Sequence, residues 1–483
     1  MSFNKNQTFR VIGIFIGLFV TFPVIGKLVI YPAPSGATLN NEFIVLVRET
    51  GTIAWLDLAE YSATVIHRIG STEVGKPNTS FVYFDTSDSV DIKIKWNGSS
   101  VINKVRIRPL SYNITPVVDT TSKTITLSIA GPKYLVVDIN EDIYRNLQIF
   151  ANPIEANPPG DTDPDVTYIH TGTIHNGDIH LTDGKTLYIA GGAIVKGCVY
   201  ADNTTGAKIL GRGMIYQPSY DAISAKYVNN LTVDGIIEVN YGWANNGGCA
   251  FRLGQGNNVT ISNLKVFSCN KWGDGIDMFC SSNVTVDNAF LRTGDDAICV
   301  YGTVKGEFKG DNYNINVTNS VLWNDIARPI HLGVYGDDLN DGNGNIYRDI
   351  TFKNIDVLEQ NEYKVGSSGV IALTVGGKNY LSDIRFEDIR IEDLSLGKLL
   401  HIVVYYMSSY NKAPGRGING IYLKNISFND LNANPSTIAG YDTSRITQNI
   451  IFENLRINGK LILNADSGNI KIGQYTKNIR FYP

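Results

Sequence analysis

The first third of the chain alternates apolar and polar residues with a period of two. The clearest segments are FIVLVRE at 43–49, SFVYFD at 80–85, VDIKIKW at 90–96, VRIRPL at 105–110 and TITLSI at 124–129. Turn residues such as Asn97-Gly98 separate them. Alternation with one apolar face is typical of antiparallel strands packed as a sandwich. We therefore predict a β-sandwich over residues 27–150.

A second pattern begins after a Pro- and Asp-rich stretch at 151–165, ANPIEANPPGDTDPD, which predicts a linker. A short unit starting with Asn or Asp then recurs at spacings of 24 to 42 residues, most of them between 25 and 34. Its copies begin at Asn230, Asn258, Asn283, Asn316, Asp349, Asp383, Asn425, Asn449 and Asn478. The units are rich in β-branched residues and contain no amphipathic helix, which favours a parallel β-helix over a helical or leucine-rich repeat. The predicted fold is all-β, an N-terminal sandwich followed by a right-handed parallel β-helix at 166–483.

Length and composition refine this picture. The 483 residues suggest about three average domains, but a solenoid adds coils without widening its core, so we expect two unequal domains. The 47 glycines fit a fold with many tight turns. Lys and Arg number 42 against 46 Asp and Glu, so the chain lacks the positive excess of a nucleic-acid binder.

The N-terminus predicts export. A short region with Lys5 and Arg10 precedes the apolar run VIGIFIGLFVTFPVIG at 11–26, which is the pattern of a secretory signal. The run is shorter than the roughly 20 residues that span a membrane, yet an uncleaved membrane anchor is the alternative because no clean cleavage site is visible. We expect a secreted, periplasmic or cell-surface monomer.

The five cysteines form no CxxC pair, which argues against a zinc site or a dense disulfide framework. We predict buried thiols, with one or two disulfides as the alternative. No metal ion or organic cofactor is expected.

A cluster of aspartates marks the predicted active site. Asp274 and Asp277 lie in DGID, and Asp295 and Asp296 follow about one coil later in GDD. Equivalent positions on neighbouring coils are about 4.8 Å apart, so Asp274 should lie one rung from the Asp295–Asp296 pair. Carboxylates this close raise one another's pKa, which lets one act as a general acid while another stays ionised. Turn chemistry and a calcium site are the alternatives.

DGID followed by GDD resembles the polygalacturonase-type β-helix enzymes of glycoside hydrolase family 28. The resemblance implies that Asp295 is the acid and that Asp274 and Asp296 activate water for inversion. The family's Gly-His-Gly and Arg-Ile-Lys signatures, which hold the galacturonate carboxylate, are missing from the expected window. NDIARPIHLG at 324–333 stands in their place. Without these basic residues we expect a neutral sugar.

A β-sandwich before the β-helix is similar instead to glycoside hydrolase family 49, the dextranase and isopullulanase group. We therefore predict an inverting hydrolase that cleaves an α-linked glucan such as dextran, with acid and base carboxyls roughly 6.5–9.5 Å apart. A polygalacturonase or related pectin hydrolase is one alternative. The other is a non-catalytic carbohydrate-binding solenoid.

Five further residues are predicted to contact the polysaccharide. Trp272 and Trp243 offer aromatic faces for sugar rings, with core packing as the alternative. Asp277 belongs to the DGID motif, and Arg328 and His331 lie one repeat beyond the aspartate pair.

Overall fold

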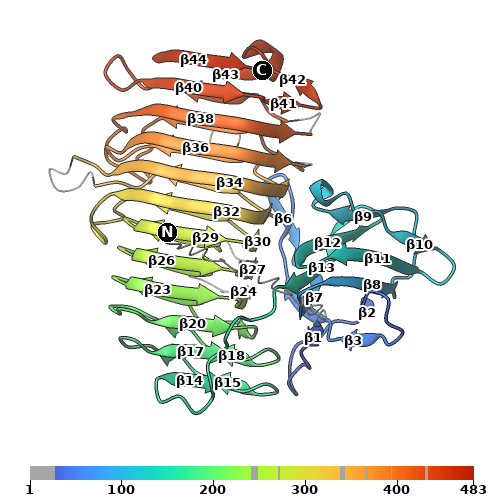
Figure 1. The fold of residues 1–483 in the computed structure, drawn as a ribbon. Helices are drawn as coiled ribbons and strands as arrows, with labels where there is room; N and C mark the ends of the chain where they lie inside the picture. Colours follow the sequence, from blue (N-terminus) through green and yellow to red (C-terminus); the bar gives the residue numbers. More distant parts are fainter. Residues whose placement is uncertain are drawn as a thin grey trace, which may run out of the picture.

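The computed structural model describes residues 28–240, 248–269, 272–337, 343–364, 368–392, 394–429 and 433–483. Figure 1 shows a tall column of stacked strands, with a smaller sheet domain beside it. The helical elements of these residues are two short 3-10 turns, Leu110–Tyr112 and Asp466–Gly468, and among them none is long and apolar enough to cross a membrane. The predicted all-β class is therefore confirmed, whereas the apolar run at 11–26 lies outside the described residues.

Residues 28–152 form the sandwich, whose core lies between two sheets and includes Val45, Val82, Ile92 and Leu135. The first sheet contains β1 (Leu28–Ile30), β7 (Asn78–Thr86), β13 (Asp142–Asn152), β12 (Lys133–Ile139) and β9 (Val105–Arg108), with β4 (Tyr61–Thr64) beside β7. The second contains β10 (Val117–Asp119), β11 (Thr124–Ala130), β8 (Ser89–Trp96), β2 (Phe43–Glu49) and β3 (Leu56–Leu58). The expectation of purely antiparallel pairing is wrong at one place, because β13 runs parallel to β7. A separate hairpin joins β5 (His67–Ile69) to β6 (Thr72–Gly75).

The β-helix begins at Val166, and residues 153–165 form no strand. Its longer sheet has 20 strands: β14 (Val166–Ile169), β15 (Ile174–Asn176), β17 (Thr186–Ile189), β18 (Ile194–Lys196), β20 (Lys208–Gly211), β21 (Met214–Tyr216), β23 (Asn229–Asp234), β24 (Ile237–Asn240), β26 (Asn257–Ser262), β27 (Lys265–Ser268), β29 (Ser282–Asp287), β30 (Phe290–Thr293), β32 (Asn312–Asn324), β34 (Ile346–Gln360), β36 (Tyr380–Ile391), β38 (Gly417–Phe428), β40 (Thr447–Glu453), β41 (Arg456–Ile457), β42 (Lys460–Leu461) and β44 (Thr476–Tyr482). The other has 11: β16 (Ile179–His180), β19 (Val199–Tyr200), β22 (Ile223–Lys226), β25 (Phe251–Gly254), β28 (Ile276–Phe279), β31 (Ile298–Tyr301), β33 (Ile330–Gly333), β35 (Ile371–Val375), β37 (Leu400–Val404), β39 (Ser436–Ala439) and β43 (Ile470–Ile472). Pairing between successive coils is parallel, and one continuous apolar core runs inside them.

The repeated Asn and Asp residues are corners of the coils with a left-handed backbone. Asn283 and Asn314 both have φ near +53°, at 54° and 52°, and the Asn314 side chain donates to Asn283 Oδ1 at 2.7 Å. Asn tolerates this conformation, and its amide continues the ladder from coil to coil. The corner residue predicted from the sequence is wrong in two of the repeated units. The corner in the fourth unit is Asn314 rather than Asn316, and Asn425 belongs to a second ladder, in which Asn454 donates to it at 2.9 Å.

All five cysteines are free and buried, as predicted for thiols packed in stacked coils.

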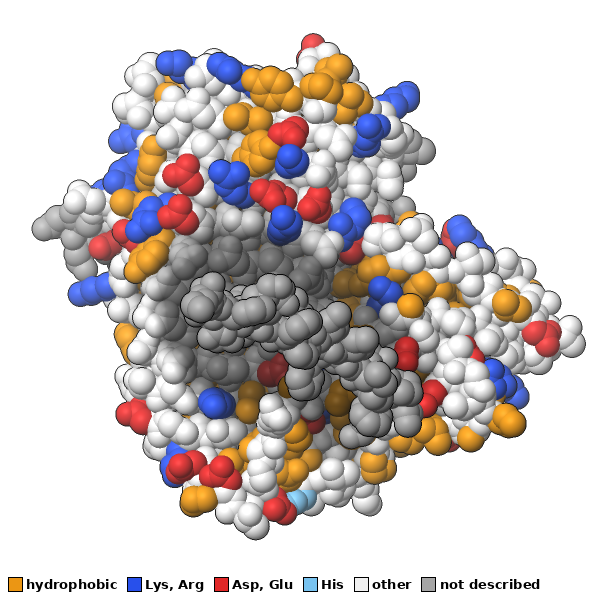
Figure 2. Space-filling view, in the orientation of Figure 1, with side chains coloured by type: hydrophobic (Ala, Val, Ile, Leu, Met, Phe, Trp, Pro, Cys, Tyr) orange, Lys and Arg blue, Asp and Glu red, His pale blue; other side chains and the backbone are white. Residues whose placement is uncertain are grey.

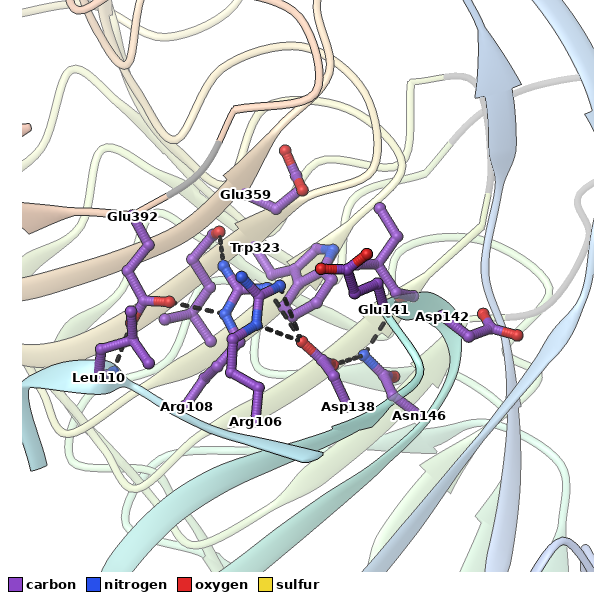
Figure 3. A network of polar contacts seen from close by, with 12 residues as sticks. Arg106, Arg108, Leu110, Asp138, Glu141, Asp142, Asn146, Trp323, Glu359 and Glu392 are labelled. Carbon is purple, nitrogen blue, oxygen red and sulfur yellow. Dashed lines mark hydrogen bonds and ion pairs between the residues drawn. The ribbon is translucent and has the colours of Figure 1, made fainter. Parts of the chain in front are cut away.

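A buried polar network joins the two domains (Figure 3). Arg108 of the sandwich is fully buried, and its Nε donates to Glu392 of the β-helix at 2.6 Å. Its Nη1 lies 3.4 Å from Asp138, and its guanidinium lies 4.8 Å from the ring centroid of Trp323. Aromatic packing continues this interface, where Phe81 of the sandwich stacks on Phe267 of the β-helix. The domains are therefore held in a fixed relation.

Replacing Arg108 should be costly. We expect Arg108→Met to lower the free energy of unfolding by about 3 kcal/mol or more, because it leaves the buried Glu392 carboxylate without its counter-charge. Urea and thermal unfolding would measure the loss, with the exposed Arg145→Met as the matched control. A change below about 1 kcal/mol, the range of a surface pair, would contradict a structural role for this network.

Glu238 is a buried charge-bearing side chain in the β-helix. It lies on β24 between Ile215 and Val266 of the neighbouring coils, is fully buried, and neither carboxyl oxygen has a hydrogen-bond partner among the described residues. Burial, and secondarily the charge of Asp221, raises the pKa of Glu238 well above its usual range. Burial therefore favours the protonated form of this carboxyl in the folded protein.

We expect Glu238→Met to raise the free energy of unfolding at pH 7 by about 2 kcal/mol, the cost of an unpaired buried polar group. The unfolded chain releases this proton above about pH 4.3 while the folded chain keeps it, so wild-type stability falls as pH rises. The gap between variant and wild type should thus widen from pH 4 to pH 7 in urea titrations. An equal gap at both pH values would show that burial does not control this carboxyl.

Candidate active site

Along the strands of the shorter sheet, side chains point alternately into the core and out into the cleft. On β28, Ile276 and Met278 point into the apolar core, so Asp277 faces outward. Asp277 is in register with Cys299 on β31, which is in register with His331 on β33. The three outward positions therefore form one row across three coils.

A second row lies two residues before the same strands. It consists of Asp274, Asp296 and Arg328. The backbone hydrogen bonds between coils continue to this row: Gly275 N–H donates to the carbonyl of Asp296, and Ala297 N–H donates to the carbonyl of Arg328, both at 2.9 Å. Asp296 N–H also donates to Asp274 Oδ1 at 3.1 Å. Asp274 is thus one rung from the Asp295–Asp296 pair, as the sequence predicted.

These rows open into a cavity of about 700 Å³. Strands β28, β31, β33, β35 and β37 form its floor, and the β5–β6 hairpin of the sandwich forms part of its wall. Figure 1 shows β6 running upward between the column and the sandwich. On the face drawn in Figure 2, acidic and basic side chains of the β-helix are intermixed.

Asp296 is held as a carboxylate. Arg328 Nη1 lies 3.0 and 2.9 Å from its two oxygens, His331 Nδ1 lies 2.7 Å from Oδ2, and the Tyr301 hydroxyl donates to Oδ2 at 3.1 Å. Burial by itself raises the pKa of Asp296, but the charge of Arg328 and the hydrogen bonds outweigh burial and hold it well below its usual range. Thr374 lies 2.6 Å from His331 Nε2, and burial lowers the pKa of His331. A neutral ring with its proton on Nδ1 fits both contacts.

The neighbouring Asp295 behaves oppositely. Its Oδ2 accepts from the backbone N–H of Trp272 at 3.1 Å, and its Oδ1 from the N–H of Asp296 at 3.0 Å. Burial, and next the charge of Asp296, raises the pKa of Asp295 to about 7, against the opposing effect of Arg328. Two adjacent aspartates therefore have separated pKa values, which is the condition for one of them to serve as a general acid.

Asp274 and Asp277 share the remaining polar space. Burial and the three neighbouring aspartates raise the pKa of Asp274 well above its usual range. Asp274 Oδ2 has a weak contact of 4.0 Å with Cys299 Sγ. Burial raises the pKa of Asp277 to about 6 although Arg252 opposes it. Asp274 and Asp277 also share a side-chain hydrogen bond, so the cluster retains protons near neutrality.

Asp274, Asp277 and Cys299 also lie close enough for their side-chain ligand atoms to surround one metal ion. A thiol must lose its proton to bind a metal, whereas burial, and next Asp277, raises the pKa of Cys299 well above its usual range. The absence of a metal stays a prediction.

Comparison with known proteins places the chain in a family. The family model "Glycosyl hydrolases family 28" matches residues 178–463, more than half of the chain and all of the aspartate cluster. The chain belongs to glycosyl hydrolase family 28. The prediction of an enzyme is therefore confirmed at the level of the family, in preference to a non-catalytic solenoid.

Three relatives describe the neighbourhood of this family 28 chain. It is similar to Putative galacturan 1,4-alpha-galacturonidase A of Aspergillus niger, with 24% identity over 188 residues, covering 36% of the chain and 40% of the relative. The chain thus spans less than half the length of that relative. Dex49A from Penicillium minioluteum superposes with a TM-score of 0.61 at 15% identity, over 93% of the chain and 94% of Dex49A. A family 28 exopolygalacturonase of Yersinia enterocolitica gives 0.46 at 14% identity, over 81% and 96%.

The predicted contact residues of this family 28 protein lie as follows. Trp272 is 52% exposed and lines the cavity. Asp277, Arg328 and His331 line the cavity, but Arg328 and His331 contact Asp296. Trp243 lies outside the described residues.

Sequence reasoning missed four groups of this family 28 site. Tyr301 binds Asp296, Thr374 binds His331, and the buried Glu362 lines the same cavity. Arg68 enters from the sandwich. The alternation of β31 could have revealed Tyr301, which lies two residues after Cys299. No local pattern in the sequence marks the other three residues.

Proposed function

We propose that the protein is an inverting glycoside hydrolase that cleaves an α-linked polysaccharide. The observation that carries the proposal is the separated environment of the adjacent aspartates. Asp296 is ionised by Arg328 and His331, while the pKa of Asp295 rises to about 7. Asp295 protonates the glycosidic oxygen, as a general acid with a pKa near the working pH should.

Asp274 is the residue we assign to water activation. Both oxygens of Asp296 are already occupied by Arg328, and Oδ2 also by Tyr301 and His331. Asp274 is held less tightly: it shares a side-chain hydrogen bond with Asp277, and its Oδ2 has a weak 4.0 Å contact with Cys299 Sγ. The productive state therefore needs a pH at which Asp274 has lost its proton while Asp295 still holds one, and the fixed charge on Asp296 supports the positive charge that develops on the sugar.

Two substrate classes have support. A neutral α-glucan such as dextran follows from the sequence resemblance to family 49, and the whole-chain fold match to Dex49A is in keeping with it. Galacturonan follows from the family 28 match and from the Aspergillus niger relative.

The test is hydrolysis of dextran, pullulan and polygalacturonate, followed by reducing-end release and by NMR of the first product anomer. An α-linked substrate should release β-configured sugar first. Release of the α anomer would overturn inversion, and no turnover on any α-linked polysaccharide would overturn the function.

We also propose that the chain is exported, which the N-terminal pattern at 1–26 supports, and that it is a monomer. Cell fractionation with N-terminal sequencing would show the chain outside the cytoplasm, either cut near residue 26 or retained as an anchor, and light scattering would give its mass.

A further inference from the structure

The β5–β6 hairpin is fixed against the β-helix next to the active site. At its base Ile66 is buried with Cys269 and Ile326 of the β-helix. The His67 ring stacks on Tyr144 at 4.0 Å, and the Arg68 carbonyl accepts from Asn361 Nδ2 at 3.3 Å. The sandwich therefore presents Arg68 to the cavity from an anchored position.

Arg68 meets two residues from the loop that follows β34. Its guanidinium lies 5.5 Å from the ring centroid of Tyr363, and Lys364 Nζ lies 5.6 Å from the same centroid. All three side chains line the cavity that contains the aspartates. A phenol ring with two cations on it, one from each domain, thus forms part of the cavity wall.

The four Arg and Lys residues that line the cavity differ in their ion pairing. Arg252 pairs with Asp221 at 2.7 Å, and Arg328 pairs with Asp296 at 2.9 Å. Within the described ranges, neither Arg68 nor Lys364 has a carboxylate within ion-pair distance, although Glu73 is the cross-strand neighbour of Arg68. Arg68 Nε also has no hydrogen-bond partner there. Two cations with unused donors therefore face the cavity.

We propose that Arg68 and Lys364 form a subsite for a sugar unit that carries an anionic group, either a uronate carboxylate or a sulfate ester. A guanidinium fork binds such oxygens with charge-assisted hydrogen bonds, and Tyr363 offers a face to the sugar ring. The subsite rests on the proposed function and selects an acidic glycan over the neutral glucan that the sequence predicted. It also makes the β-sandwich a working part of the active site.

Two matched pairs of glycans test this subsite: polygalacturonate against its methyl ester, and dextran sulfate against dextran. Binding is measured by calorimetry in the Asp295→Asn background, where turnover does not interfere. We expect the charged member of at least one pair to bind about tenfold or more tightly, and which pair responds identifies carboxylate or sulfate. Arg68→Met and, independently, Lys364→Met should each remove about tenfold of that preference, whereas Arg68→Lys should keep part of it.

Lys76→Met is the control, because Lys76 is exposed just after β6 and does not line the cavity. It should leave the preference unchanged, which separates the subsite from general attraction of polyanions. Equal binding within both pairs, or a preference that both Met variants retain, would overturn the subsite. In either case hydrolysis of dextran by the wild type would leave the proposed function standing, whereas failure of all hydrolysis would overturn the function alone.

Discussion

Asp295→Asn should lower kcat by about 10³- to 10⁴-fold, the upper range for loss of a general acid. The amide keeps the size of the carboxyl, and its one oxygen can still accept from either Trp272 or Asp296, but it has no acidic proton to give to the leaving oxygen. Sugar binding should persist, so the loss should appear in kcat with little change in KM. Steady-state kinetics on the polysaccharide that the wild type hydrolyses would measure it.

The pH dependence of kcat tests the role of Asp295 in a second way. Because burial raises the pKa of Asp295 to about 7, wild-type kcat should fall as the pH passes through about 7 and the acid loses its proton. The residual activity of Asp295→Asn should lack this alkaline limb. Asp349→Asn is the control, since Asp349 is an exposed corner residue on β34 and should keep full activity. An Asp295→Asn enzyme within about tenfold of wild type would assign the proton to another group.

Arg328→Met should lower kcat by about 10²-fold and displace the alkaline limb of the pH profile upward. Arg328 places two contacts on Asp296 and also lowers the pKa of Asp295. Without this charge the pKa of both carboxyls should rise. Asp296 should therefore keep its proton to a higher pH, and activity should end at a higher pH, where Asp295 loses its proton.

Arg328→Lys is the matched variant because it keeps the charge and loses the planar guanidinium. Its profile should stay close to the wild-type position even if kcat falls. Thermal unfolding of both variants would separate catalytic loss from misfolding. If the profile of Arg328→Met superimposes on that of the wild type, the charge of Arg328 does not set the ionisation of the aspartate pair.

Much of the architecture can be predicted from the sequence because its causes are local. The alternation at 43–49 and 124–129 gave strands with nearly the predicted limits, β2 and β11. The row of Asp274 beside Asp296 was also predictable, because one coil of a parallel solenoid places residues about one repeat apart on adjacent rungs. The sequence did not identify the correct corner residue in the units at Asn316 and Asn425, because the two ladders of corner residues look alike in the sequence.

What the tertiary structure decided is which charges meet in the cavity. No period links Arg68 to Tyr363, because they approach only where the sandwich hairpin packs on the β-helix. The difference in pKa between Asp295 and Asp296 likewise depends on Arg328 and His331, which come from the next coil and make their direct contacts with Asp296. The sequence by itself determined an all-β chain with stacked aspartates, since hydrophobic period and coil length are local properties. Only the folded chain determined which aspartate keeps its proton, since burial and charge depend on neighbours that are distant in sequence.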